Sequence, residues 1–136
     1  MQFYSAANLS EAALLIPVDA ILNTLDAEHV LTRFHDPKIS EDGLFFVKKK
    51  LEEGVNLAIV SDNDSQSYKY DLMDQLPSVI PVFTAANHKG RYKAISTTMF
   101  KKACEYFITA PNKAVHIKIN LWPSFVPIDL NSWQVY

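Results

Sequence analysis

The stretch Ala20-Ile21-Leu22-Asn23-Thr24-Leu25-Asp26 decides the fold of this chain. An apolar run from Val18 to Leu22 follows Pro17 and predicts a buried strand. We expect this strand to end at Leu22, because polar Asn23 and Thr24 come next and begin a loop. A polar loop directly after a buried strand is where α/β proteins hold ligands. Thr24 and Asp26 are therefore the first candidate site residues.

Helix and strand signals alternate after this stretch. Ser40-Glu41-Asp42 predicts a helix start, with a hydroxyl cap and acids at the positive end of the helix dipole, and Gly54 predicts its end. The apolar positions Leu44, Val47 and Leu51 predict its buried face. The same reasoning predicts further strands at 55–60, 79–83 and 114–119, and helices around 67–76 and 96–107. Pro81 indicates either an edge position or an imperfect strand for the run that contains it.

Strands that alternate with helices predict a three-layer α/β domain with a mainly parallel sheet. Since parallel strands all end at one edge, residues 23–26, 61–64 and 118–120 are expected to lie there together. The chain of 136 residues has the length of a single domain, so we assign residues 1–136 to one unit.

Composition excludes several functional classes. A net charge of -2 argues against a nucleic-acid-binding protein, which would normally show a basic face. No apolar run approaches the roughly 20 residues that a transmembrane helix needs. The single cysteine, Cys104, fits a reducing compartment, and the N-terminus has no basic region typical of a secretory signal. We therefore expect a cytoplasmic protein.

Two segments carry a resemblance to a known family. Residues 54–63, Gly-Val-Asn-Leu-Ala-Ile-Val-Ser-Asp-Asn, form a strand that ends in a hydroxyl residue and polar neighbours. Phe100-Lys101-Lys102-Ala103 and then residues 111–117 form a helix and a strand. With the stretch before Asp26, they resemble the haloacid-dehalogenase-like (HAD) superfamily, in the cap-less branch that includes phosphatidylglycerophosphate phosphatases. The resemblance covers residues 18–119 and implies a HAD-like, Rossmann-like fold without a cap domain.

The resemblance implies a role for each matching position. In this family an aspartate attacks phosphorus and a second one, two residues on, handles the proton of the leaving group. A hydroxyl and a lysine neutralise the phosphate oxygens, and a further acid helps to hold Mg²⁺. Carried onto this chain, Thr24 stands at the nucleophile position, Asp26 at the acid–base position and Ser61 at the phosphate-binding hydroxyl. Lys93, or less well Lys89, matches the lysine.

These positions depart from the family's chemistry. Thr24 brings no negative charge, and Lys118 or Ile119 stands where a metal-binding acid is needed. One carboxylate is a thin ligand set for Mg²⁺, which prefers six oxygens. We therefore expect no metal or other cofactor and a catalytically degraded HAD-like protein that acts by protein–protein interaction or by weak anion binding. The alternative is an active, Mg²⁺-dependent phosphomonoester phosphohydrolase with a nonstandard site.

Three other patterns have competing interpretations. Asp62 and Asp64 are weak candidates for a metal site, whereas a polar loop in which Asp64 or Ser65 caps the next helix is favoured. Cys104 could serve as a nucleophile with one of the four histidines, but it shares an apolar stripe with residues 100, 103 and 107, which indicates a buried thiol. His116 alternates with apolar residues and is expected to pack between sheet and helix.

The segment 121–136 is rich in aromatic residues. Trp122, Phe125 and Trp133 are candidates for binding a protein partner if they are exposed, and for an added strand or a packing arm if they fold back. A structural subunit that docks through this tail is thus a third functional hypothesis.

Overall fold

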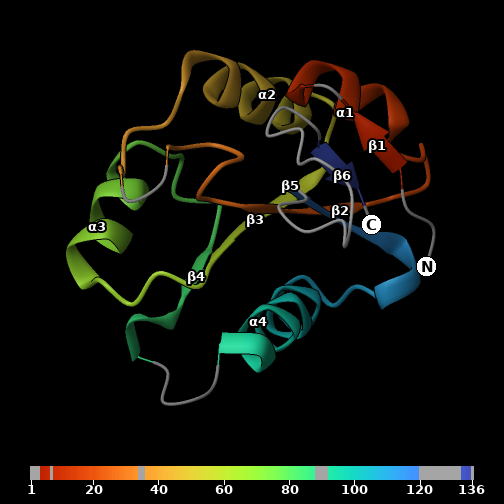
Figure 1. Ribbon diagram of the computed structural model, residues 1–136. Coiled ribbons are helices and arrows are strands. Elements are labelled where there is room, and N and C mark those ends of the chain that lie inside the picture. Colours follow the sequence, from red (N-terminus) through yellow and green to blue (C-terminus); the bar gives the residue numbers. More distant parts are fainter. Residues whose placement is uncertain (1–3, 7, 34–35, 88–91, 120–132, 136) are drawn as a thin grey trace, which may run out of the picture.

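Four parallel strands with helices on both faces form the centre of the molecule (Figure 1). The computed structural model describes residues 4–6, 8–33, 36–87, 92–119 and 133–135. Its sheet has the order β1-β6-β5-β2-β3-β4. The bounds of the parallel strands are Leu22–Asp26 for β2, Asn56–Ser61 for β3, Val82–Thr84 for β4 and Ala114–Ile119 for β5. The predicted three-layer, Rossmann-like α/β fold is confirmed.

The helices divide between the two faces of the sheet. Helices α1 (Leu9–Leu15) and α2 (Glu41–Glu52) cover one face, and α4 (Tyr92–Tyr106) covers the other (Figure 1). Helix α3 (Gln66–Asp74) buries Tyr68 and Leu72 in the same core as α1 and α2. On the opposite face, Ala103 and Cys104 pack against β2 and β3, with Phe100 and Phe107 beside them, as the apolar stripe predicts.

The predicted position of the first parallel strand is wrong. Residues Pro17 to Ala20 form a turn, closed by a hydrogen bond of 3.0 Å from Ala20 N to Pro17 O, and Val18 is fully exposed. The strand begins at Leu22 and continues to Asp26, so Asn23 and Thr24 lie inside it and are fully buried. Pairing with β3 and β5 on both sides overrides the local polarity of these residues.

Asn23 is an unusual occupant of this strand. Side chains alternate along β2, and Asn23 shares a face with Leu25, which packs in the core below α1 and α2. Neither polar atom of its amide has a hydrogen-bond partner within the described chain. Because a buried amide without partners costs about 1–3 kcal/mol, Asn23 weakens the centre of the sheet.

Helix α2 has the predicted ends but a rotated buried face. Ser40 Oγ accepts a hydrogen bond of 3.0 Å from Gly43 N at the start, and Gly54 adopts a φ of 79° at the end. The buried positions are Gly43, Phe46, Val47 and Lys50, whereas Leu44 is exposed. Gly43 permits this rotation, because a Cβ there would lie 3.1 Å from side-chain atoms of the loop before the helix.

The remaining strands enlarge the sheet on one side. Strand β6 (Trp133–Val135) runs antiparallel to both of its neighbours, β5 and β1 (Tyr4–Ala6). Trp133 therefore belongs to an inner strand of the sheet, while Trp122 and Phe125 lie outside the described residues. Strand β4 forms the opposite edge, as Pro81 indicated.

The sequence led us to expect neither a cap domain nor a membrane-spanning helix. In the described residues between β2 and β3, one helix, α2, is present and no cap domain is seen. Within the described residues, no helix has both the length and the apolar character needed to cross a lipid bilayer.

Candidate functional site

The carboxyl ends of β2, β3 and β5 lie side by side at one edge of the sheet. Strand β2 is in the middle and pairs in parallel with both neighbours. It ends at Asp26, and β3 ends at Ser61. The last pair in the register between β2 and β5 is Leu25 with Ile117, so Asp26 and Lys118 follow it on the two strands. The three strands thus end at one edge, with Asn120 outside the described residues, and this edge is the natural place for a ligand in such a sheet.

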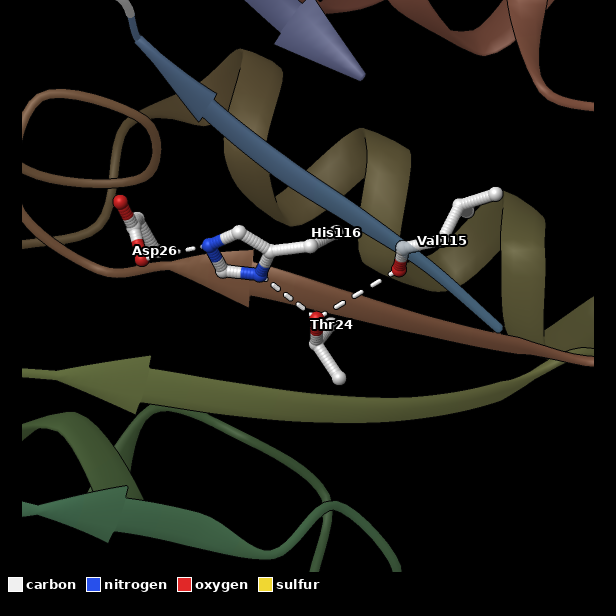
Figure 2. A network of polar contacts seen from close by, with 4 residues as sticks. All are labelled: Thr24, Asp26, Val115 and His116. Carbon is white, nitrogen blue, oxygen red and sulfur yellow. Dashed lines mark hydrogen bonds and ion pairs between the residues drawn. The ribbon is translucent and has the colours of Figure 1, made fainter. Parts of the chain in front are cut away.

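A chain of three polar side chains connects β2 to β5 (Figure 2). Thr24 Oγ1 lies 2.6 Å from His116 Nδ1, and His116 Nε2 lies 3.0 Å from Asp26 Oδ1. Thr24 is completely buried, whereas the side chain of Asp26 is 32% exposed, so the chain leads from the core to the surface. His116 also contacts the Phe100 ring of α4 edge to face, which confirms that it packs between sheet and helix.

Two proton arrangements satisfy this chain. With a neutral imidazole, Thr24 donates to Nδ1 and the Nε2 proton is donated to Asp26. With a protonated imidazole, Nδ1 donates to Thr24, whose hydroxyl turns to Val115 O at 3.4 Å. Asp26 accepts a hydrogen bond in both, so the chain fixes the orientation of its carboxylate.

Two further acids surround the end of β2. Glu28 Oε1 accepts a hydrogen bond of 3.3 Å from Asn63 Nδ2, which joins the loop after β2 to the loop after β3. The pKa of Asp62 is raised, chiefly because partial burial disfavours its charged form and then because Glu28 and Asp26 repel that charge. Asp26, Glu28 and Asp62 therefore lie close enough for their charges to interact at this edge of the sheet.

A buried hydroxyl cluster lies behind these acids. Tyr68 OH is 3.0 Å from Thr32 Oγ1. Burial raises the pKa of Tyr68 to about 12, so it stays protonated at neutral pH. Ser61 is buried, and its Oγ accepts a hydrogen bond of 3.1 Å from Asn63 N. The hydroxyl expected to bind phosphate thus serves the turn that follows β3.

The structure brings some of the predicted residues together. Asp26, Ser61 and Asp62 meet at the strand ends, and Thr24 lies below them inside β2, closed to solvent. Ser65 caps α3, because its Oγ accepts a hydrogen bond of 3.3 Å from Tyr68 N. Among the phosphate-binding lysines, the backbone of Lys93 belongs to α4, but its side chain and all of Lys89 lie outside the described part.

The described residues do not fit a magnesium site. No three histidine, cysteine, aspartate or glutamate side chains among them are close enough to hold a metal ion. Asp26 already accepts from His116, and β5 places a lysine and not an acid beside the end of β2. The strand beside β2 thus supplies no acid to share a hard divalent cation with Asp26.

Sequence reasoning missed two residues of this site. Glu28 follows Asp26 with one residue between them, a spacing that is visible in the sequence but hidden by the misplaced end of the strand. His116 was expected to pack in the core, and its contact with Asp26 depends on the pairing of β2 with β5. No local signal reports a contact between residues so far apart in the chain.

The other nucleophile hypothesis finds no support in the described chain. Cys104 is buried, and burial, followed by repulsion from Glu105, raises the pKa of its thiol. Cys104 belongs to α4 and packs against the sheet, whereas His116 belongs to the strand-end network. His35 and His88 are outside the described residues.

Comparisons with protein-family models, with curated proteins and with solved structures find no match for this chain.

Proposed function

We propose that this chain is a catalytically degraded HAD-like protein that acts by binding a protein partner. The observation that supports the proposal is the 3.0 Å contact between His116 Nε2 and Asp26 Oδ1. In a phosphatase of this family, the strand that neighbours the nucleophile supplies an acid for Mg²⁺. Here the strand beside β2, β5, contains no acid; it supplies the imidazole of His116, which holds the carboxylate of Asp26 in place.

A protein partner is favoured over a free anion by charge. Glu28 and Asp62 lie near Asp26, and both raise the energy of any further negative charge at this edge. Ser61 is buried and already accepts a backbone hydrogen bond. A phosphate group would meet repulsion and find few free donors among the described side chains.

A second candidate is the active, Mg²⁺-dependent phosphohydrolase. Strand β2 ends at Asp26, and Glu28 follows two residues later. These two acids therefore have the position and the spacing that the family needs for its nucleophile and its acid–base group. Ser61, at the end of the adjacent strand β3, would then face the same edge. Under this hypothesis Asp26, and not Thr24, is the nucleophile.

A phosphatase assay separates the two candidates. Small and lipid phosphomonoesters are incubated with Mg²⁺ and the wild-type chain, Asp26→Asn or Asp74→Asn, the last an exposed control at the end of α3. The binding proposal expects no turnover above the buffer blank for all three proteins. Turnover that disappears in Asp26→Asn and persists in Asp74→Asn would reject it in favour of the enzyme.

A melting experiment gives an independent answer. A ligand of the native state raises the melting temperature in proportion to the logarithm of its concentration once it exceeds Kd. The enzyme hypothesis expects such a rise with Mg²⁺ and orthovanadate together. The binding proposal expects the same melting temperature with and without them.

A further inference from the structure

An open cavity lies at the opposite end of the molecule from Asp26. It is formed by the last two turns of α4 and by the loop that leads to the amino end of β5. Its volume is about 610 Å³, and its lining is mostly apolar, including Ile108, Ala110 and Pro111. Since the chain enters β5 here, the cavity is separated by the length of the parallel strands from the acids at the carboxyl ends.

Ile108 on the rim of this cavity is both strained and exposed. It follows α4 in the left-handed conformation, with φ of 50°, and 95% of its surface is exposed. The surrounding hydrogen bonds, from Ile108 N to Glu105 O and from Thr109 N to Cys104 O, form a helix end at which glycine is the usual residue. A β-branched residue in this conformation is a genuine outlier, and such strain is a reason to look for a function. Its side chain gains almost no burial within the monomer.

Two opposite charges share the face that Ile108 extends. Lys101 and Glu105 are four residues apart, so they lie on one side of α4. Both line the cavity together with Ile108, which follows the helix. Lys101 and Glu105 are exposed, and neither forms an ion pair with another described residue. Because this face carries one positive and one negative side chain, two copies related by a two-fold rotation could pair Lys101 of one with Glu105 of the other.

We propose that this face of α4 is a self-association surface and that its occupant is a second copy of this chain. In a two-fold contact the same patch faces itself, so each residue meets a different residue of the other copy. Ile108 of each copy enters the cavity of the other, and Lys101 of each lies within reach of Glu105 of the other. In this contact Ile108, which is exposed in the monomer, becomes buried against the second copy. It involves none of the residues of the strand-end site, so it does not depend on the proposed function.

Sedimentation equilibrium on the full chain tests the proposal. Wild type is expected to dimerise, and Ile108→Asp to weaken the dimer by about tenfold or more, because the cost of burying a charge opposes association. The matched control is Leu14→Asp, which changes an aliphatic residue that is 86% exposed on α1, on the other face of the sheet. This variant should dimerise as wild type does. Circular dichroism shows that each variant is folded.

A charge exchange tests the predicted pairing. Lys101→Glu and Glu105→Lys each place like charges opposite one another and should weaken the dimer, and combining them should restore it. A wild-type chain that stays monomeric at its highest soluble concentration would overturn the proposal. A dimer that is insensitive to Ile108→Asp would overturn it too, since the contact would then lie elsewhere.

Discussion

Asn23 and Thr24 are adjacent buried polar residues with opposite energetic consequences. They occupy consecutive positions of β2 and therefore face opposite sides of the sheet. Thr24 is satisfied by His116 and Val115, whereas the amide of Asn23 has no partner in the described chain. Isosteric replacement of each side chain separates the effect of burial from that of hydrogen bonding.

We expect Asn23→Leu to stabilise the protein and Thr24→Val to destabilise it. Leucine has the branched shape of asparagine and removes the unsatisfied amide, so the free energy of unfolding should rise by about 1 kcal/mol. Valine has the shape of threonine but lacks the hydroxyl that contacts His116 and Val115, so the free energy of unfolding should fall by about 1 kcal/mol. Urea unfolding measures both. A loss of stability in Asn23→Leu would mean that the methyl groups do not fit.

The raised pKa of Asp62 makes a prediction about pH. Its carboxyl group is more easily protonated in the folded chain than in the unfolded one, so ionised Asp62 destabilises the fold as pH rises through its folded pKa. Asp62→Asn should therefore raise the melting temperature at pH 7. The gain should shrink as pH falls through the raised folded pKa toward the unfolded value of about 4, and it should be absent below that, where both states hold the proton. Asp74→Asn is the control, and a gain that persists at low pH would exclude this cause.

At the scale of elements, two helices end in the same way with different residues. After α2, the hydrogen bonds from Gly54 N to Leu51 O and from Val55 N to Lys50 O match the pattern after α4. Gly54 has a φ of 79° at the position where Ile108 has 50°. Only the glycine adopts this conformation without strain.

Replacing the glycine at 54 and introducing a glycine at 108 should change the free energy of unfolding in opposite directions. Gly54→Ala introduces a Cβ with nothing within 4 Å, so only backbone strain acts, and we expect a loss of about 1 kcal/mol. Ile108→Gly removes strain and should raise the stability of the monomer by about 1 kcal/mol. Both are measured by urea unfolding at dilutions where any dimer has dissociated. Equal effects of the same sign would contradict this account.

The elements whose ends depend on local signals could be predicted from the sequence. The cap at Ser40, the end of α2 at Gly54 and the apolar run of β5 are all encoded within a few residues, and the structure has them. It failed where contacts distant in sequence decide. Burial of Asn23 and Thr24 between two partner strands moved the end of β2 by four residues, from Leu22 to Asp26, and with it the whole alignment of the candidate site.

At the scale of the whole molecule, β6 joins two parts of the sheet. It pairs with β5 on one side and with β1 on the other, so β1 reaches the sheet only through it. The hypothesis that the aromatic tail is a separate docking arm must account for the backbone of Trp133 in this inner position.

Removal of residues 121–136 should therefore destabilise the domain itself. The truncated chain would lose the backbone hydrogen bonds on both sides of β6 and leave the β5 edge open. We expect a lower melting temperature and faster amide hydrogen exchange in β5. A truncated chain that melts like wild type but loses a binding partner would instead support the docking arm.

The pairing of β2 with β5 also governs how quickly this chain can reach its native state. The paired residues Thr24 and His116 are far apart in sequence, whereas β2 and β3 are joined by a short helical connection. Closing the longer loop costs more entropy, so β2 and β3 have the opportunity to associate first. Until β5 arrives, one long side of β2 presents unsatisfied amides and carbonyls, a template on which nascent molecules can aggregate during refolding.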